Sequence, residues 1–220
     1  MPSSRRSFVR RQTRLRAVPG LEDIRLHLAD DALALWRAVQ VESGDPDTPI
    51  PFWAFAWGGG LAIARYIRDH PDAVASRRVF DLGSGSGLCA ITAAAAGAAD
   101  VVAADIDPFA AAAMELNARA NGVRLAVMTR DVLGEGPPDT DTILAGDCWY
   151  DATLAGRVMP WLRRAREGGI DVIVGDPGRR YLPVDELVEL AAYEVRTTTE
   201  LEDLERKTAR VYGLRDLSGA

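Results

Sequence analysis

Short apolar runs alternate with longer helical patterns between residues 77 and 176. Apolar runs of about four to eight residues between turn signals are typical of buried strands. Such runs occur at 77–82, 100–105, 123–128, 141–147 and 170–176. The segments between them predict helices, and one of these has Pro108 in its first turn and Gly122 beyond its end, which is the usual arrangement. Strands that alternate with helices predict a mostly parallel sheet covered on both faces.

The two ends of the chain give different patterns. Apolar residues between Leu21 and Val39 recur at helical spacing, and "GLAIARYIRDH" (60–70) and "PVDELVELAAY" (183–193) also predict helices. Two further strands, "YEVRTTTE" (193–200) and "KTARVYGL" (207–214), are separated by only a few charged residues, so we expect an antiparallel hairpin at one edge of the sheet. The fold class is therefore α/β and Rossmann-like, with a mostly parallel seven-stranded sheet.

The length of 220 residues suits a single domain. Residues 1–16 contain six arginines and no acidic residue, and we interpret residues 1–20 as a basic, flexible arm. The twin-arginine pattern "SSRRSFVRR" lacks the apolar stretch of an export signal, while a transit peptide stays an alternative. We expect one domain over residues 21–220, with a helical N-terminal cover (21–75) and a sheet core (76–220).

Charge and composition narrow the function classes. The net charge is −6, so the chain beyond the basic start carries −12, which argues against broad nucleic-acid binding. No apolar window is long enough to span a membrane. With two cysteines, two histidines and no CxxC spacing, we predict neither a disulfide framework nor a metal site. A reducing, cytoplasmic compartment fits best, and the excess of arginine, alanine and glycine indicates a GC-rich bacterial genome. We expect a monomer.

The chemistry-bearing residues follow the predicted strands, where ligands bind in such sheets. The first strand ends in "DLGSGSG" (81–87), with Asp81, Gly83, Gly85 and Gly87. Glycines there allow a sharp turn and close approach of the backbone to a ligand. The loop is not a dinucleotide fingerprint, because Leu88 stands where that pattern needs glycine, and no P-loop is present. Asp105 and Asp131 follow the second and third strands and could accept hydrogen bonds from a ribose and hold an adenine amino group.

The segments "DLGSGSG", "ADIDP" and "RDV" together resemble the cofactor site of class I (seven-strand) S-adenosylmethionine-dependent methyltransferases. The C-terminal hairpin also fits that fold. The resemblance implies S-adenosyl-L-methionine as the cofactor. The cofactor-binding residues that it implies are Trp53, Trp57, Asp81, Gly83, Ser84, Gly85, Gly87, Asp105, Ile106, Asp131 and Val132. The alternative is an α/β protein whose glycines are only turn residues.

A narrower resemblance covers residues 48–183. "AGDCWYD" (145–151) is a D-x-x-Y pattern similar to the motif of protein lysine methyltransferases after the fourth strand. With "PFWAFAWGGG" (51–60), "NARANGV" (117–123) and "VGDPGRRYLP" (174–183), it resembles the electron transfer flavoprotein β-subunit lysine methyltransferases and their bacterial relatives. The resemblance implies protein-lysine N-methylation of that β subunit, or of a ribosomal stalk protein. The alternatives are a small-molecule N-methyltransferase of nicotinamide or amine type, and a binding module without catalysis.

The resemblance implies that Asp147 and Tyr150 are catalytic: the carboxylate would hold the target ammonium, and the ring would line its channel. Asp147 could instead cap the following helix, although Asp151 is placed for that role. Aromatic rings attract ammonium and sulfonium cations, and alternation would place Trp53 and Trp57 at the site; the alternative is a hydrophobic clamp of all the rings in 52–57. "GDPGRR" (175–180) either shapes the rim of the pocket or is only an exposed turn.

Overall fold

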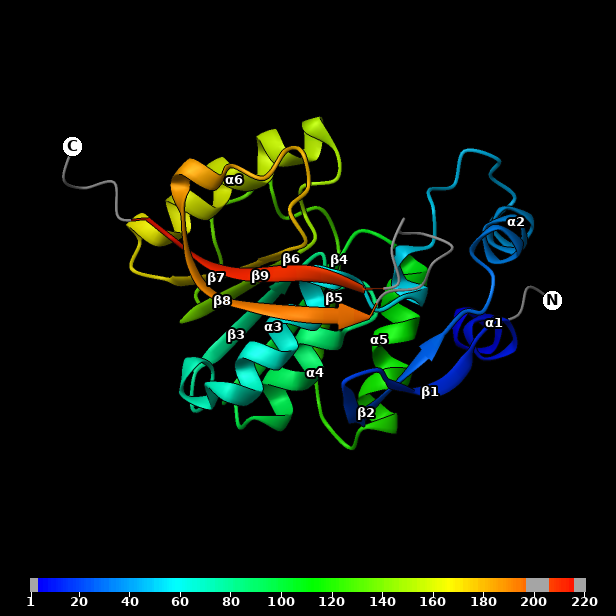
Figure 1. The fold of residues 1–220 in the computed structure, drawn as a ribbon. Helices are drawn as coiled ribbons and strands as arrows, with labels where there is room; N and C mark the ends of the chain where they lie inside the picture. The colour runs from blue at the N-terminus through cyan, green and yellow to red at the C-terminus, as the bar shows by residue number, and fades with distance from the viewer. Residues whose placement is uncertain (1–3, 197–205, 216–220) are drawn as a thin grey trace.

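The computed structural model describes residues 4–196 and 206–215, and its central feature is a seven-stranded sheet (Figure 1). The strands lie in the order β5-β4-β3-β6-β7-β9-β8. The predicted α/β fold is confirmed, since β3 to β7 run parallel and β8 and β9 form an antiparallel edge hairpin. The strands are β3 Arg78–Leu82, β4 Asp100–Asp105, β5 Ala126–Thr129, β6 Thr142–Gly146, β7 Asp171–Asp176, β8 Leu187–Arg196 and β9 Arg206–Leu214.

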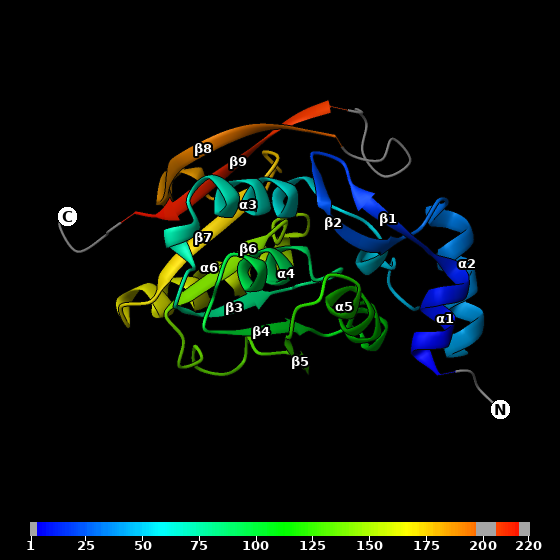
Figure 2. The same cartoon turned by 90° about the horizontal axis from the view of Figure 1, so that it is seen from below.

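Helices cover both faces of this sheet. The helices α3 (Gly58–Asp69), α4 (Leu88–Ala95) and α5 (Pro108–Ala120) share one apolar core, and α6 (Ala152–Glu167) packs into a second core on the other face. Figure 1 shows α6 above the sheet and α3 and α4 below it, and Figure 2 shows α3, α4 and α5 side by side. From β3 the chain builds the sheet in one direction through β4 and β5, and then in the other direction through β6 and β7. Ligands bind at such a switch point in the strand order.

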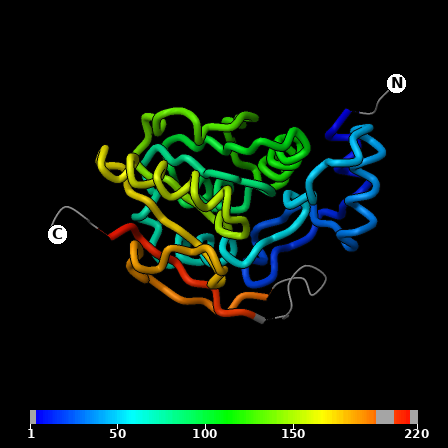
Figure 3. Tube along the Cα trace, turned by 90° about the horizontal axis from the view of Figure 1, so that it is seen from above, coloured from blue at the N-terminus to red at the C-terminus, as the bar shows by residue number. Residues whose placement is uncertain are grey.

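The expectation of a flexible basic arm is wrong for residues 5–18. They form α1 (Arg5–Gln12) and β1 (Arg14–Val18), and these elements lie at one end of the sheet core (Figure 3). Phe8 and Val9 are 2% and 0% exposed, and the Phe8 ring lies 5.1 Å from that of Phe109 in α5. Phe8 and Val9 thus enter the core. The arginines around them reach acidic partners, and Arg6 pairs with Glu115.

The predicted helix over Leu21–Val39 is only half correct. Its first part is a strand, β2 (Leu21–Leu28), which pairs antiparallel with β1, and the helix α2 covers only Ala32–Ser43. Ile24, Leu26 and Leu28 alternate with polar residues, and β2 buries Ile24 and Leu26. Leu21, Ile24 and Leu28 have the spacing of a helix, so both patterns are present, and the pairing with β1 decides between them.

Two other boundaries differ from the prediction. The helix expected over 183–193 is a short turn, η3 (Val184–Glu186), followed directly by β8, because backbone pairing with β9 extends back to Leu187. Strand β5 begins at Ala126 rather than at residue 123. The predicted connection between the last two strands lies mostly outside the described residues. Among the described helices, none has the length and apolar character needed to cross a membrane.

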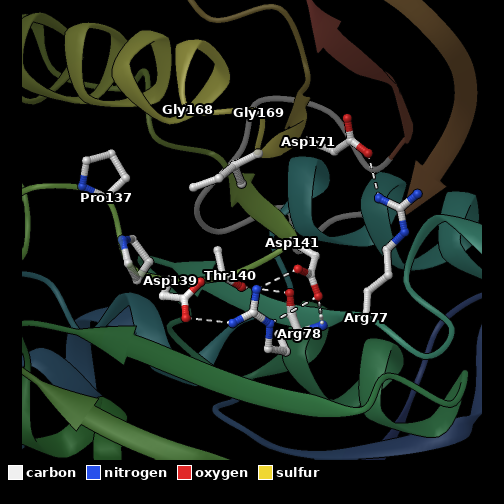
Figure 4. A pocket seen from close by; sticks show the side chains of 11 residues that line it. Arg77, Arg78, Pro137, Asp139, Thr140, Asp141, Gly168, Gly169 and Asp171 are labelled. Carbon is white, nitrogen blue, oxygen red and sulfur yellow. Dashed lines mark hydrogen bonds and ion pairs between the residues drawn. The ribbon is translucent and has the colours of Figure 1, made fainter.

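A polar pocket opens at the amino ends of β3, β6 and β7 (Figure 4). Arg78 forms ion pairs with Asp139 and Asp141, and Arg77 pairs with Asp171. These ion pairs join the starts of the three strands. The pocket therefore lies at the end of the sheet opposite the glycine loop, and the arginines and aspartates that line it form ion pairs with one another.

Candidate active site

The glycine loop follows β3 and adopts a backbone that favours glycine. Gly83, Gly85 and Gly87 have φ angles of 63°, 52° and 83°, in the left-handed region that side chains rarely adopt. The Gly85 amide donates to the Asp105 carboxylate over 2.9 Å, which ties the loop to the end of β4. A Cβ atom at Gly85 would lie 3.8 Å from the Trp53 Cα, so the loop also touches the N-terminal cover. Glycine is therefore required by the turn itself.

Asp81 supports this loop from below. Its carboxylate is 2% exposed and accepts hydrogen bonds from the Ser84 hydroxyl and the Ala90 amide. Burial raises the pKa of Asp81 to about 7, and these two hydrogen bonds only partly oppose that shift. Near neutral pH the carboxyl group is therefore about half protonated, and it anchors the loop from inside the fold.

The residues after β4 face the loop. Asp105 accepts from the amides of Gly85 and Asp107, both over 2.9 Å, and burial raises the pKa of its carboxyl group. The next side chain, Ile106, is 70% exposed, an unusual position for a large apolar residue. A half-buried acceptor beside an open apolar side chain suits a ligand that combines hydroxyl groups with a flat ring.

Two predicted cofactor-binding residues, Val132 and the exposed Asp131, follow β5. Asp131 pairs with Arg157 of α6 over 2.6 Å and accepts from the Leu133 amide, and the hydrogen bond to Arg157 lowers the pKa of its carboxyl group. Each oxygen of this exposed carboxylate therefore has one partner within the protein, which leaves acceptor positions for a ligand. Val132 is buried at 7% exposure in the core on the α6 side.

The aromatic segment does not alternate. A turn of 3₁₀ helix, η1 (Phe52–Ala54), buries Trp53 at 1% exposure, and its ring stacks on Phe109 at 6.3 Å. The expectation that Trp53 and Trp57 both face the site is wrong, because the segment is not a strand: its 3₁₀ turn buries Trp53, while Trp57 stays half-buried. Instead the half-buried rings of Phe52 and Trp57 lie 5.5 Å apart.

Tyr150 completes an aromatic cluster that consists of Phe52, Trp57 and Tyr150. Its ring lies 5.1 Å from that of Phe52, and the residue is 50% exposed. Partial burial is the main cause that raises the pKa of its hydroxyl above the usual value. The neighbouring Cys148 is buried, and burial raises the pKa of its thiol, so it packs as an uncharged group. Partly exposed rings beside a glycine loop suit a cationic ligand.

Asp147 follows β6 and joins three parts of the fold. Its φ is 60°, and its amide donates to the Gly175 carbonyl of β7 over 2.9 Å. Its carboxylate accepts from the Gly59 and Gly60 amides over 3.0 and 2.7 Å, and these amides begin α3. Asp147 therefore caps α3, not the helix that follows it; Asp151 caps that one through the Leu154 amide. A carboxylate at a helix N-terminus is a favourable arrangement.

Arg179 from the loop after β7 also contacts Asp147. Its guanidinium forms an ion pair with the Asp147 Oδ1 and lies 3.3 Å from Asp176 Oδ2. Asp176 is fully buried and accepts from the Gly178 and Arg179 amides over 2.7 and 2.6 Å. The turn in "GDPGRR" carries Arg179 to the carboxylate after β6, whereas Arg180 is exposed. The pattern D-P-G predicts only the turn.

These residues fit a nucleoside ligand with a cationic end. The glycine loop, the half-buried acceptor Asp105, the exposed Ile106 and Tyr150 follow parallel strands at the same edge of the sheet, and Phe52 of the aromatic cluster contacts Tyr150 there. The described residues hold no group of histidine, cysteine and acidic side chains that could bind a metal.

Comparisons with known proteins agree with this geometry. A family model described as ribosomal protein L11 methyltransferase (PrmA) matches residues 69–146. The electron transfer flavoprotein β-subunit lysine methyltransferase of Xenopus laevis is 37% identical over 219 residues, covering 96% of this chain and 84% of the relative. The rat protein of the same name is 36% identical over 168 residues, and the match spans 74% of this chain and 66% of the relative. The ribosomal protein L11 methyltransferase of Symbiobacterium thermophilum is 38% identical over 108 residues, 47% of this chain and 36% of that protein.

Solved structures show the same fold. The ribosomal protein L11 methylase of Lactobacillus delbrueckii has a TM-score of 0.51 at 21% identity, over 78% of this chain and 83% of that one. The magnesium protoporphyrin IX methyltransferase of Synechocystis, crystallised with bound S-adenosylmethionine, has a TM-score of 0.51 at 14% identity, over 71% and 78% of the two chains. At these identities the likeness concerns the fold alone.

Proposed function

We propose the substrate of this enzyme from one premise: the chain belongs to the family of electron transfer flavoprotein β-subunit lysine methyltransferases. It is accordingly an S-adenosylmethionine-dependent methyltransferase that acts on protein lysine. We propose that its target is the β subunit of electron transfer flavoprotein. The observation that carries this proposal is the similarity to the Xenopus laevis relative over most of both chains.

We propose that the edge after β3, β4 and β5 holds the cofactor. The loop from Gly83 to Gly87, with Ser84, would contact its polar end, and Asp105 would accept from the ribose hydroxyls. Ile106 would cover the adenine, with Val132 and the backbone around Asp131 beside it. When bound, S-adenosylmethionine supplies an electrophilic methyl group on a sulfonium. Trp57 would face this cation with its ring, whereas Trp53 would contribute its backbone near Gly85.

We propose that Asp147 and Tyr150 receive the lysine amine. A lysine with an ordinary pKa of about 10.4 is protonated at pH 7, and the neutral form costs roughly 4–5 kcal/mol. The site must therefore favour the amine over the ammonium. Asp147 would orient the nitrogen, and the ring of Tyr150, next to Phe52, would exclude water from one side.

The test uses tritiated S-adenosylmethionine with purified electron transfer flavoprotein and ribosomal stalk proteins from the same organism. Label in the flavoprotein β subunit, and its loss when the target lysine becomes arginine, would support the proposal. A ribosomal stalk protein is the second candidate, because the L11-methyltransferase family model and relatives of that name match the chain. Label there alone would favour the second candidate. Label only in a small-molecule fraction would overturn both.

We also propose a setting for this reaction. A reducing bacterial cytoplasm fits, because both cysteines are free and buried. Nucleic acid is an unsuitable partner, since the chain is acidic overall and arginines of its basic start, such as Arg6 and Arg16, already pair with acidic residues. We propose that the enzyme works as a monomer and away from membranes.

A further inference from the structure

The Asp147 carboxylate is nearly saturated with donors. Within residues 4–196 and 206–215, its Oδ1 accepts from the Gly59 amide and the Arg179 guanidinium, and its Oδ2 accepts from the Gly60 amide. An ionised carboxylate offers about four acceptor positions. One acceptor position of Asp147 therefore remains for a substrate nitrogen, and the same carboxylate is already paired with the Arg179 guanidinium.

Arg179 is held in this place from its other side. Its amide donates to Asp176 Oδ1, and its guanidinium lies near Asp176 Oδ2. Asp176 is fully buried, and the Arg179 side chain is 18% exposed. A short turn with Gly178 at φ 91° connects the two residues. The guanidinium is thus part of a built network and not a surface side chain that happens to lie near.

The two thiols near Asp147 are uncharged, and the carboxyl group of Asp176 lies against Arg179. Cys89 in α4 and Cys148 after β6 are both buried, and burial raises the pKa of both thiols, so they are neutral at working pH. Burial also raises the pKa of Asp176 above its ordinary value, and partial burial raises that of Tyr150. The strong positive charges that face Asp147 are therefore the Arg179 guanidinium and the partial charge at the N-terminus of α3.

We propose that Arg179 is a positioning residue that lowers the pKa of the substrate amine in the enzyme–substrate complex. The inference rests on the proposed function, because it concerns the amine that Asp147 receives. A nitrogen on the free position of the carboxylate shares that carboxylate with the guanidinium. A like charge at such separation disfavours the ammonium and shifts its pKa by about one unit or more. Arg179 thus makes the site select the neutral amine rather than trap the cation.

This arrangement matters because only the neutral amine can react. The nitrogen lone pair forms the new N–C bond while the methyl C–S bond breaks and its electron pair stays on sulfur. The proton that distinguishes ammonium from amine leaves to solvent beforehand. Without Arg179, Asp147 would be a better partner for the ammonium, so substrate would bind in the unreactive form.

The experiment compares Arg179→Gln, Arg179→Lys and a matched control, Arg180→Gln, whose side chain is exposed and stacks on Tyr181. Methylation of purified electron transfer flavoprotein β subunit is followed from pH 6 to 10, and kcat reports the pKa in the complex. For Arg179→Gln we expect the kcat profile to move about one pH unit upward. Below both pKa values kcat falls about tenfold, KM does not rise, and near pH 10 the deficit disappears. Arg179→Lys keeps the wild-type profile within about 0.3 unit, because the charge remains.

Proton release gives a second readout that needs no turnover. Calorimetry of β-subunit binding, without methyl donor and in two buffers of different ionisation enthalpy, measures the protons released per complex. At pH 8 to 9 we expect the wild type and Arg180→Gln to release more protons than Arg179→Gln. Thermal melting confirms that each variant is folded before either measurement.

The outcomes separate the two proposals. If the wild type does not methylate the β subunit, the proposed function fails. If the wild type is active and Arg179→Gln loses the same activity at every pH, with unchanged proton release, the arginine is only structural and this inference is wrong. Equal profiles for the Lys and Gln variants would overturn it as well, because charge would then have no effect.

Discussion

Replacing Gly59 with alanine would put a methyl group where two backbone segments already touch. A Cβ at Gly59 would lie 2.1 Å from the Gly175 carbonyl oxygen and 2.7 Å from Asp147 Oδ2. A Cβ at Gly175 would meet the Gly59 carbonyl oxygen at 2.2 Å, so the contact is tight from both sides. Separations under 3 Å from backbone atoms require the start of α3 to move away from β7, since a carbonyl cannot rotate aside as a side chain does.

The size of the effect follows from two opposing contributions. Overpacking a well-packed core costs about 1–3 kcal/mol, and the rigid partners here favour the upper end. Alanine regains up to about 1 kcal/mol of helix propensity relative to glycine. We expect a net loss of about 2 kcal/mol in the free energy of unfolding, measured by urea denaturation. For a chain of this length that corresponds to a melting temperature lower by about 4–8 °C.

Gly60→Ala is the matched control, one residue further along the same helix. Its Cβ would meet Cys89 Sγ at 3.7 Å and Asp147 Oδ2 at 3.9 Å, which are ordinary contacts. This variant keeps its amide donor to Asp147, and we expect stability equal to or slightly above that of the wild type. If Gly59→Ala unfolded at the same urea concentration as Gly60→Ala, the close approach of α3 to β7 would be refuted.

Three other changes probe the site. Asp105→Ala removes the acceptor proposed for the ribose, so cofactor affinity by calorimetry should fall at least about tenfold, at roughly 1.4 kcal/mol per factor of ten; unchanged affinity would show that the residue only ties the glycine loop. Asp147→Ala should abolish methyl transfer while cofactor affinity stays within about twofold, and an equal loss of both would mean that the residue is misplaced in the proposal. Asp81 has a pKa raised to about 7, so its contribution to stability is complete below about pH 4 and is lost as pH rises through 7. The urea midpoint of the wild type should therefore decline over this pH range, and Asp81→Asn should remove the decline. An equal decline in the wild type and in Asp81→Asn would contradict the raised pKa of Asp81.

The sheet could be predicted because its strands carry local signals. Short apolar runs followed by or ending in glycine or aspartate mark β3, β4, β6 and β7; β3, β6 and β7 are buried almost throughout, and β4 is buried at half of its positions. The N-terminal region lacks such a signal. Leu21, Ile24 and Leu28 have helical spacing, whereas Ile24, Leu26 and Leu28 have the spacing of a strand, and the choice depends on pairing with β1, which itself lies in a segment rich in arginine. Tertiary pairing overrides local periodicity where both periods fit.

The contacts of Asp147 show what no local pattern can supply. Its motif indicates a functional carboxylate, but the amides that bind it lie 87 and 88 residues earlier in the chain, and Arg179 lies 32 residues later. These groups meet only because β6 and β7 are neighbours in the sheet and α3 crosses their ends with glycines in place of side chains. These contacts explain why glycines occupy positions 58–60, which the sequence alone does not explain. The first two are buried, Gly59 leaves room for the backbone of β7, and the Gly59 and Gly60 amides hold the carboxylate that we propose receives the amine.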